Sequence, residues 1–466
     1  MSRYWFIFVL CFYFCIIIEA EENDSTATLS TLTGGNARIL ALGGSPSNPF
    51  LLDHTDIYTN PAHLMQFKDL LFIEVGHGFG NGSAYTANNQ SIGITFSLNA
   101  WAFGLSVGVR EGPMFADNSY GFQSGGSFRA CDYMKSALDT YLQSLAVWQT
   151  SEPTFPMHLF CAKQIGDVIA GVTFYHSNWS RNDHGTGSVS TEKTCSSSLS
   201  QIGIKAGAIV PLSWRSKCDI AGCIRLNRAK ANYSNINPTA PLISSSFDAT
   251  GYEFSISARL LYEASVSTTL VPYASIELFS YEPELSYTPL IYQGVPFPNE
   301  YGKKEFEIGF GVNHRLKRGL VAAGISLRYL ALVNNATTKT GELPQTTYYT
   351  RSWTDFPTIN VGVEYFITTW LIGRTGLFKR LSTQTTTTEP PTPSLPTQTS
   401  STVEYSFLPS FGLNASEQTL SLGIGLLIKD ISINAYIAEQ VLGTGTYLMS
   451  GIEQSLFGVL SINYKL

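Results

Sequence analysis

The chain has 466 residues, 29 basic and 35 acidic side chains, and a formal net charge of −6. Charged residues make up 14% and aromatic residues 13%, whereas soluble domains carry about 25% charged residues. This composition excludes a disordered chain, which would hold fewer aromatic residues, and a nucleic-acid-binding protein, which would show a basic surplus. After residue 18 no apolar run reaches the roughly 20 residues that a membrane-spanning helix needs.

Residues 1–20 are predicted to be a secretory signal peptide. Arg3 precedes an unbroken apolar run from Tyr4 to Ile18, and Ala20 is a small residue suited to cleavage. The alternative is an uncleaved anchor helix, but this run is short for a membrane span of about 20 residues. The sequence therefore predicts an exported protein.

The next segment, residues 21–66, contains the stretch GGNARILALGGSPSNPFLLDHTDIYTNPAHLM at 34–65. Gly43 and Gly44 interrupt any regular element, and Pro61 follows Asn60 in a turn-like pair. We expect an irregular, compact segment before the first strand. In front of a barrel, such a segment can fold into the lumen and plug it.

From residue 68 onward, apolar residues alternate with small or polar ones, as at 92–98, 254–260, 306–312, 359–365 and 420–428. A strand places successive side chains on opposite faces, so each segment has one apolar face. A soluble β-sandwich also shows this alternation. Membrane strands of about ten residues, aromatic girdles and alternating short and long connections favour a transmembrane antiparallel β-barrel over 67–466 instead.

The predicted aromatic girdle and the predicted connections between strands involve the following residues. Aromatic side chains near segment ends are Trp101, Tyr175, Trp179, Tyr262, Tyr281, Trp353 and Trp370. Short turns are predicted at Asn99–Ala100, Gly166–Asp167, Lys317–Arg318 and Thr368–Thr369, and long connections at 111–152, 178–196, 282–302, 334–352 and 381–416.

The strand count follows from the end of the chain. Leu460, Ile462, Tyr464 and Leu466 alternate to the C-terminus, as in a last barrel strand. A periplasmic C-terminus requires an even count, so 381–416 is read as one long extracellular loop. The raw count is sixteen, and the two least regular segments, 197–211 and 217–231, leave fourteen open.

Two outer connections have distinct character. Residues 382–402 are almost wholly Thr, Ser, Pro and Gln, which predicts a flexible surface loop, with an antigenically variable tip as the alternative. Residues 127–148 carry a helical period. This helix packs on the barrel mouth or presents an exposed apolar groove for a lipophilic ligand. The candidate groove residues are Met134, Leu138, Tyr141 and Leu145.

Charged residues on the predicted inward face include Lys205, Glu307 and Glu364. Arg259 and Arg328 are candidates for binding a ligand carboxylate; alternatively, they pair with other lumen charges or with the N-terminal segment. Five cysteines follow the signal peptide, and Cys218 with Cys223 is a candidate disulfide that would close a small loop. The Cys and His spacings fit no metal site.

No enzyme is predicted. Gly104–Gly108 matches G-x-S-x-G, but a nucleophile elbow needs a strand-to-helix turn, and this match lies inside a predicted strand. The histidines show no H-E-x-x-H pattern and there is no phosphate-binding loop. We expect no catalytic residues and no cofactor.

The N-terminal segment resembles the hatch of the FadL family of outer-membrane long-chain fatty-acid transporters. The resembling residues are Ala37-Arg38, Gly43-Gly44, Asp53 and Asn60-Pro61-Ala62 with Leu64. The signal segment, threonine-rich loop and cysteines look closest to FadL-like proteins of treponemes. The resemblance implies a fourteen-strand barrel with a luminal hatch that moves to release ligand.

The function implied by this resemblance is uptake of hydrophobic molecules, with long-chain fatty acids as the expected substrate, across the cell outer membrane. Its partners would be the ligand, outer-membrane lipid and the barrel-assembly machinery, without nucleic acid. A surface adhesin or antigen and a protein-export shuttle on the same barrel are the alternatives. The sequence leaves the oligomeric state open.

Overall fold

The computed structural model describes residues 33–43, 48–76, 91–108, 154–186, 192–236, 243–287, 297–340, 343–389, 397–403, 420–437 and 457–466. Within these ranges the chain begins with helix α2 (Gly35–Ala41) and the 3-10 helices η1 (His54–Tyr58) and η2 (Pro61–Met65). All regular elements that follow within the described ranges are strands.

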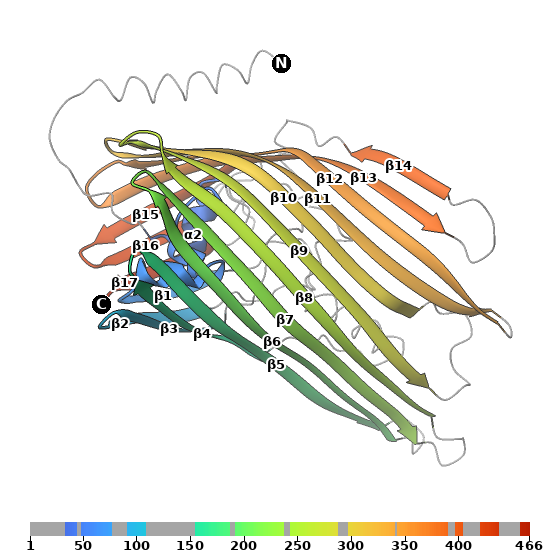
Figure 1. Ribbon diagram of the computed structural model, residues 1–466. Helices are drawn as coiled ribbons and strands as arrows, with labels where there is room; N and C mark the ends of the chain where they lie inside the picture. Colours follow the sequence, from blue (N-terminus) through green and yellow to red (C-terminus); the bar gives the residue numbers. More distant parts are fainter. Residues whose placement is uncertain are drawn as a thin grey trace, which may run out of the picture.

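The strands form one antiparallel sheet that closes on itself, because β1 pairs with both β2 and β17 (Figure 1). The ring has sixteen strand positions, which agrees with the raw sequence count of sixteen. The expectation of about fourteen strands, which the sequence left open and the family resemblance implied, is wrong. The strands are β1 (Leu70–Gly76), β2 (Ser91–Leu98), β3 (Trp101–Val107), β4 (Thr154–Ile165), β5 (Val168–Thr186), β6 (Glu192–Ser213), β7 (Ser216–Ile236), β8 (Ile243–Glu263), β9 (Thr268–Tyr287), β10 (Phe297–Leu316), β11 (Gly319–Thr340), β12 (Leu343–Phe366), β13 (Leu371–Glu389), β14 (Thr397–Val403), β15 (Leu420–Ile428), β16 (Ile431–Ile437) and β17 (Phe457–Lys465).

One ring position is shared by two strands. β13 pairs with β15 through Leu371–Leu377 and with β14 through Ser382–Thr388. β14 and β15 therefore lie end to end beside β13, which preserves the even count. The prediction that 381–416 is a single loop is wrong for its described part. Threonine is β-branched and favours strands, while four of the five prolines in 381–416 fall at 390–396, between β13 and β14 in the sequence.

Strand length is the second correction. β5 to β13 have 19 to 24 residues, about twice the predicted length. The segments 178–196, 282–302 and 334–352, predicted as long connections, are mostly paired strand. Backbone pairing continues beyond the apolar band because strand ladders do not require apolar side chains. The short turns predicted at 99–100, 166–167 and 317–318 are confirmed, and the one predicted at 368–369 lies within a four-residue turn, 367–370. These turns define what we call the short-turn end.

The outer face of the barrel is apolar, and the inner face carries polar residues beside apolar ones such as Phe72 and Phe160. In β2, Ile92 is 50% and Phe96 46% exposed, whereas Thr95 between them is 1% exposed. The same alternation continues around the ring, as in β7, where Ile220, Ile224 and Leu226 face outward. Of the aromatic residues assigned to the girdle, Trp101, Tyr262 and Trp370 are exposed, but Tyr175 and Trp353 are buried and cannot belong to an outer girdle. Among the described residues, no helix has the length and apolar character to cross a membrane.

The N-terminal segment, which we define as residues 33–69 as far as they are described, lies within the ring at the short-turn end (Figure 1). α2 contacts β13 and β15–β17, while η2 contacts β3–β6. Its buried apolar residues pack against inward-facing wall residues. One such cluster among the described residues comprises Ile57, Leu64, Phe67, Leu70, Phe72, Ala102, Phe160 and Ala162.

Candidate functional site

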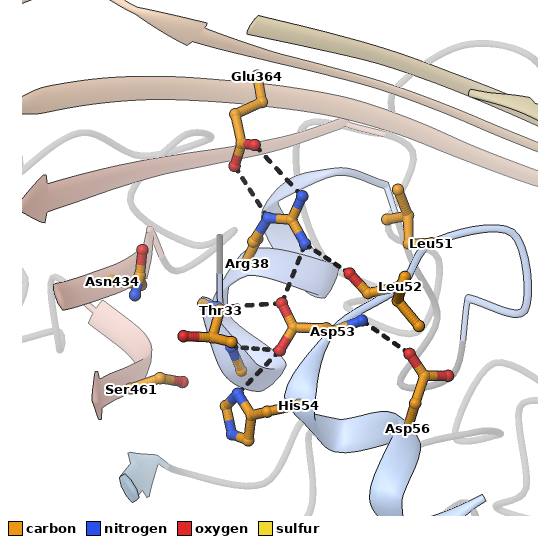
Figure 2. Close-up of polar contacts among 12 residues, drawn as sticks. Thr33, Arg38, Leu51, Leu52, Asp53, His54, Asp56, Glu364, Asn434 and Ser461 are labelled. Atoms are coloured by element: carbon orange, nitrogen blue, oxygen red, sulfur yellow. Dashed lines mark hydrogen bonds and ion pairs between the residues drawn. The ribbon is translucent and has the colours of Figure 1, made fainter. Parts of the chain in front are cut away.

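Arg38, near the middle of α2, joins the N-terminal segment to the barrel wall (Figure 2). Its guanidinium lies 3.0 Å from Asp53 Oδ2 and 3.0 Å from Glu364 Oε2, and it donates to the carbonyl of Leu52 at 3.2 Å. Glu364 on β12 also accepts from Arg374 of β13 at 2.6 Å. Two cations and two carboxylates therefore form one buried network, which we call the Arg38 cluster.

Asp53 organises the segment itself. Its carboxylate accepts hydrogen bonds from the backbone N–H groups of Gly34 and Gly35, both at 3.0 Å. His54 Nδ1 lies 2.9 Å from Asp53 Oδ1, the oxygen that also accepts from Gly35. In addition, the Asp53 backbone N–H donates to Asp56, which completes a capping box at the start of η1. One acidic residue thus holds the start of α2 and the start of η1 together.

The charge states in this cluster follow from their partners. Burial alone would raise the pKa of Asp53, but the hydrogen bond and charge of His54 and the charge of Arg38 hold it well below its usual range. Burial would lower the pKa of His54, yet Asp53, with Glu74 and Asp56, raises it. The pKa of Arg38 is raised by Glu364 and Asp53 against the effect of burial. The segment is thus held by charged groups.

A second network, the Arg259 cluster, fixes η1 and η2 to β7 and β8. Arg259 Nε lies 2.5 Å from Asp219 and its Nη2 lies 2.8 Å from Asp56. It also donates to the carbonyls of Pro49 and Leu51 at 3.2 and 3.3 Å. His63 Nε2 approaches Asp219 at 2.6 Å. Arg259 therefore faces inward as predicted, but its contacts are with the N-terminal segment and the wall, which fits the alternative reading.

The Asn60-Pro61-Ala62 motif has a defined role in this cluster. Asn60 caps η2 by accepting from the Ala62 N–H at 2.9 Å, and Pro61 occupies the first helical turn. The Asn60 amide also donates to Asp219 and to the carbonyl of Ala208. Ala62 is fully buried, and a Cβ on Gly171 of β5 would overlap its backbone. The motif combines a cap with a flat surface against the wall.

Inward-facing glycines receive the segment at two further points. The ring of Phe50 lies over Gly309, Gly311 and Gly324, where an added Cβ would overlap it. We call this the Phe50 socket. Likewise, the backbone of Leu42-Gly43 lies against Gly362 and Gly376. Such close approach is open only to glycine. The glycine-rich faces seen in the sequence are thus contact surfaces for the N-terminal segment.

Farther from the short-turn end, the wall carries its own ion pairs. Lys303 lies 2.7 Å from both Glu277 and Glu305. Arg328 lies 2.6 Å from Glu305, so it too faces inward but pairs within the wall. The assignment of Arg259 and Arg328 as binders of a ligand carboxylate therefore finds no support in their contacts.

Other predicted residues have separate outcomes. Gly44 and the groove residues Met134, Leu138, Tyr141 and Leu145 lie outside the described residues. Cys218 and Cys223 do not form the predicted disulfide. Both belong to β7, five residues apart on opposite faces, which separates them by about 16 Å. The segment between the two cysteines is therefore continuous strand and not a loop. Within the described ranges, His, Cys, Asp and Glu form no metal-binding group.

Sequence reasoning missed several residues of the two clusters. Asp219 and Arg374 were not singled out, although both occupy inward positions of alternating strands. His54 and His63 stand within the predicted hatch, but nothing local indicates their partners. Phe50 follows a proline and carries no pattern. A signal was present only in the glycines of β10 and β11, which mark places where a strand surface is approached closely.

No family model and no curated protein matches the chain. Among solved structures, the Pseudomonas putida toluene transporter TodX is 11% identical with a TM-score of 0.35, covering 94% of this chain and 99% of that chain. The Ralstonia pickettii toluene transporter TbuX is 9% identical with a TM-score of 0.36, and the match covers 94% of this chain and 97% of that chain. The ferric yersiniabactin uptake receptor FyuA from Yersinia pestis is 8% identical with a TM-score of 0.34, and the match covers 85% of this chain and 75% of that chain. TM-scores this low leave family and function to be argued from the chain's own geometry.

Proposed function

We propose that the chain is an outer-membrane transporter of hydrophobic small molecules, in which the N-terminal segment is a movable hatch, as in the FadL family. Acyl compounds are the ligand class, with long-chain fatty acids the first to test. The single observation that carries the proposal is the seating of the segment within a closed barrel through two discrete buried ion clusters. Such a segment blocks passage while it is seated.

The surface of the barrel supports a membrane location. Large apolar side chains project outward from strands on every side of the ring, including Phe174, Ile256, Phe310 and Ile424. Exposing them to water would be costly, at about 25 cal/mol per Å² of apolar surface. A lipid environment removes this cost, and closure of the ring satisfies the backbone hydrogen bonds of all strand neighbours. The proposed environment is therefore the outer membrane.

The contact between segment and wall also suits apolar ligands. Tyr58 of η1 lies edge-on to His158 and Phe160 of β4, with ring centroids 5.1 and 5.5 Å apart. Phe72 of β1 lies 6.5 Å from the same ring. Movement of η1 would uncover these aromatic faces inside the barrel. Burial of an acyl chain on such a surface gains about 0.8 kcal/mol per methylene, without a charged partner.

A disulfide lock tests whether the segment must move. The Ala37 N–H donates to Ser461 Oγ at 3.2 Å across the contact between α2 and β17, and both residues are buried. Ala37→Cys with Ser461→Cys would join the segment to the wall. Uptake of a fluorescent long-chain fatty acid into vesicles containing the barrel should stop on oxidation and return on reduction.

The parent chain under the same oxidant is the control, because it retains its native cysteines. Undiminished uptake by the fully oxidised double variant would refute hatch movement. Binding at the outer mouth should survive locking, so an adhesin would keep its activity in the locked state. The lock therefore separates a transporter from a barrel that only displays loops.

A further inference from the structure

Three polar side chains form a row across the inner wall on β5, β6 and β7. Ser177 is the register partner of Gln201, and Gln201 is the partner of Asn227. Ser177 and Gln201 are 2% exposed, and Asn227 is fully buried. On β7, Asn227 shares its face with Asp219 and with Arg225, so the row faces the lumen. We call these three residues the polar row.

The polar atoms of this row have no hydrogen-bond partner in the protein. They are Ser177 Oγ and both amide atoms of Gln201 and of Asn227. Buried polar groups are nearly always paired, and leaving one unpaired costs about 1–3 kcal/mol. On β5, Thr173 Oγ1 extends the pattern toward the N-terminal segment. Five unpaired atoms on three adjacent strands indicate a place built to pair with a ligand.

The chemistry of the row is neutral. Gln201 and Asn227 each supply amide donors and an amide acceptor, and Ser177 supplies a hydroxyl that does both. On the inward face of β7, the cation nearest to Asn227 is Arg225, which forms a buried ion pair with Glu253 of β8. A carboxylate ligand binds most strongly to a cation, whereas this row offers mixed donors and acceptors. A headgroup with several hydroxyls matches it better.

We propose that the polar row binds the neutral, hydroxyl-bearing headgroup of an acyl amphiphile. The proposal rests on the proposed transport function and narrows its ligand class from acyl compounds in general to neutral acyl compounds such as monoacylglycerols. The headgroup hydroxyls donate to the amide oxygens of the row and accept from its amide N–H groups.

The test compares two probes that carry the same acyl chain, monooleoylglycerol and oleate, on the refolded full chain. Displacement of a fluorescent acyl probe reports both affinities, at a pH where oleate is ionised. Monooleoylglycerol should bind at least about 10-fold more tightly, since each hydrogen bond that a ligand group cannot form costs about 1–3 kcal/mol. The double variant Gln201→Leu with Asn227→Leu should lower the affinity for monooleoylglycerol about 10- to 100-fold and the affinity for oleate less than about 2-fold.

Gln164→Leu is the matched control, because this amide is exposed and donates only to the Gly166 carbonyl at the short-turn end. Ser177→Ala is a milder variant that keeps the test valid where the double leucine variant fails to fold. Ser177→Ala should lower the affinity for monooleoylglycerol about 3- to 10-fold.

Oleate binding as tightly as monooleoylglycerol, or equal losses for both probes in the variants, would overturn the headgroup site and leave the transport proposal standing. Unchanged affinities in every variant would mean that the row holds water only. Absence of binding by either probe to a folded barrel, together with absence of lock-sensitive uptake, would instead overturn the proposed function and this inference with it.

Discussion

Replacing Arg38 with methionine should release the N-terminal segment while leaving the barrel intact. Methionine keeps much of the apolar stem of arginine but removes the cation that lies 3.0 Å from both Asp53 and Glu364. The side chains of those two carboxylates are fully buried. Arg38→Met therefore leaves two negative charges in the interior with fewer partners.

The size of the effect follows from what those carboxylates retain. Removing one member of a buried ion pair costs about 3–5 kcal/mol. Glu364 keeps Arg374 at 2.6 Å, and Asp53 keeps two backbone N–H groups and His54. We therefore expect a cost at the lower end of this range, about 3 kcal/mol. This cost raises the population of the released segment about 100- to 200-fold.

Hydrogen exchange measured by mass spectrometry on the refolded barrel reports this population. Peptides covering 33–43 should exchange about 100-fold faster in Arg38→Met, while strand peptides keep their rates. Arg228→Met is the matched control, because Arg228 pairs with Asp248 on the surface with 52% of its side chain exposed. Such exposed pairs contribute about 0–1 kcal/mol. Equal exchange in the two variants would refute the anchoring role of the Arg38 cluster.

Two further predictions concern the same segment. Phe50→Ala should destabilise the seated N-terminal segment by about 3–5 kcal/mol because the Phe50 socket is left empty. Gly324→Ala should loosen the segment because the added Cβ overlaps the Phe50 ring. If residues 48–69 stay as protected from hydrogen exchange in both variants as in the parent, the socket does not hold the segment. The raised pKa of His54 means that its ion pair with Asp53 stabilises fully below about pH 6.5 and is lost as pH rises through the folded pKa. The lowered pKa of Asp53 means that its contribution is present above about pH 4 and is lost at lower pH. After correction for the intrinsic rate, hydrogen exchange of residues 33–43 should therefore become faster as the pH rises through the folded pKa of His54. His54→Gln should remove this increase. If the corrected exchange rate of the parent does not change with pH, the His54–Asp53 pair does not stabilise the segment.

The fold class could be predicted because its signal is local. Alternation with period two is written into each segment, so strands, faces and short turns follow from neighbouring residues. The sixteen-strand count came from the same pattern, and the two least regular segments proved to be β6 and β7. The threonine-rich region 382–402 is predicted to be a loop from its Thr, Ser, Pro and Gln content. Its prolines occupy only 390–396, while the threonines pair in β13 and β14.

The candidate site was predictable only in outline. The Gly, Asp and Asn-Pro-Ala residues of the N-terminal segment could be named because a resemblance and their backbone preferences mark them. The inward orientation of Arg259 and Arg328 also followed from alternation. Their partners did not, because alternation places a side chain on a face without fixing its depth or its neighbour across the lumen.

The sequence alone therefore determined the local rules of this protein: a period-two chain, an apolar outer face, short turns at one end and an irregular segment before the first strand. Only the tertiary structure decided which residues meet. Arg38 pairs with Glu364 across 326 residues, and Asn60 reaches Asp219 across 159. Closure of the ring brings such residues together. Their ion pairs and the glycines beneath Phe50 acquire their roles only once the wall surrounds the segment.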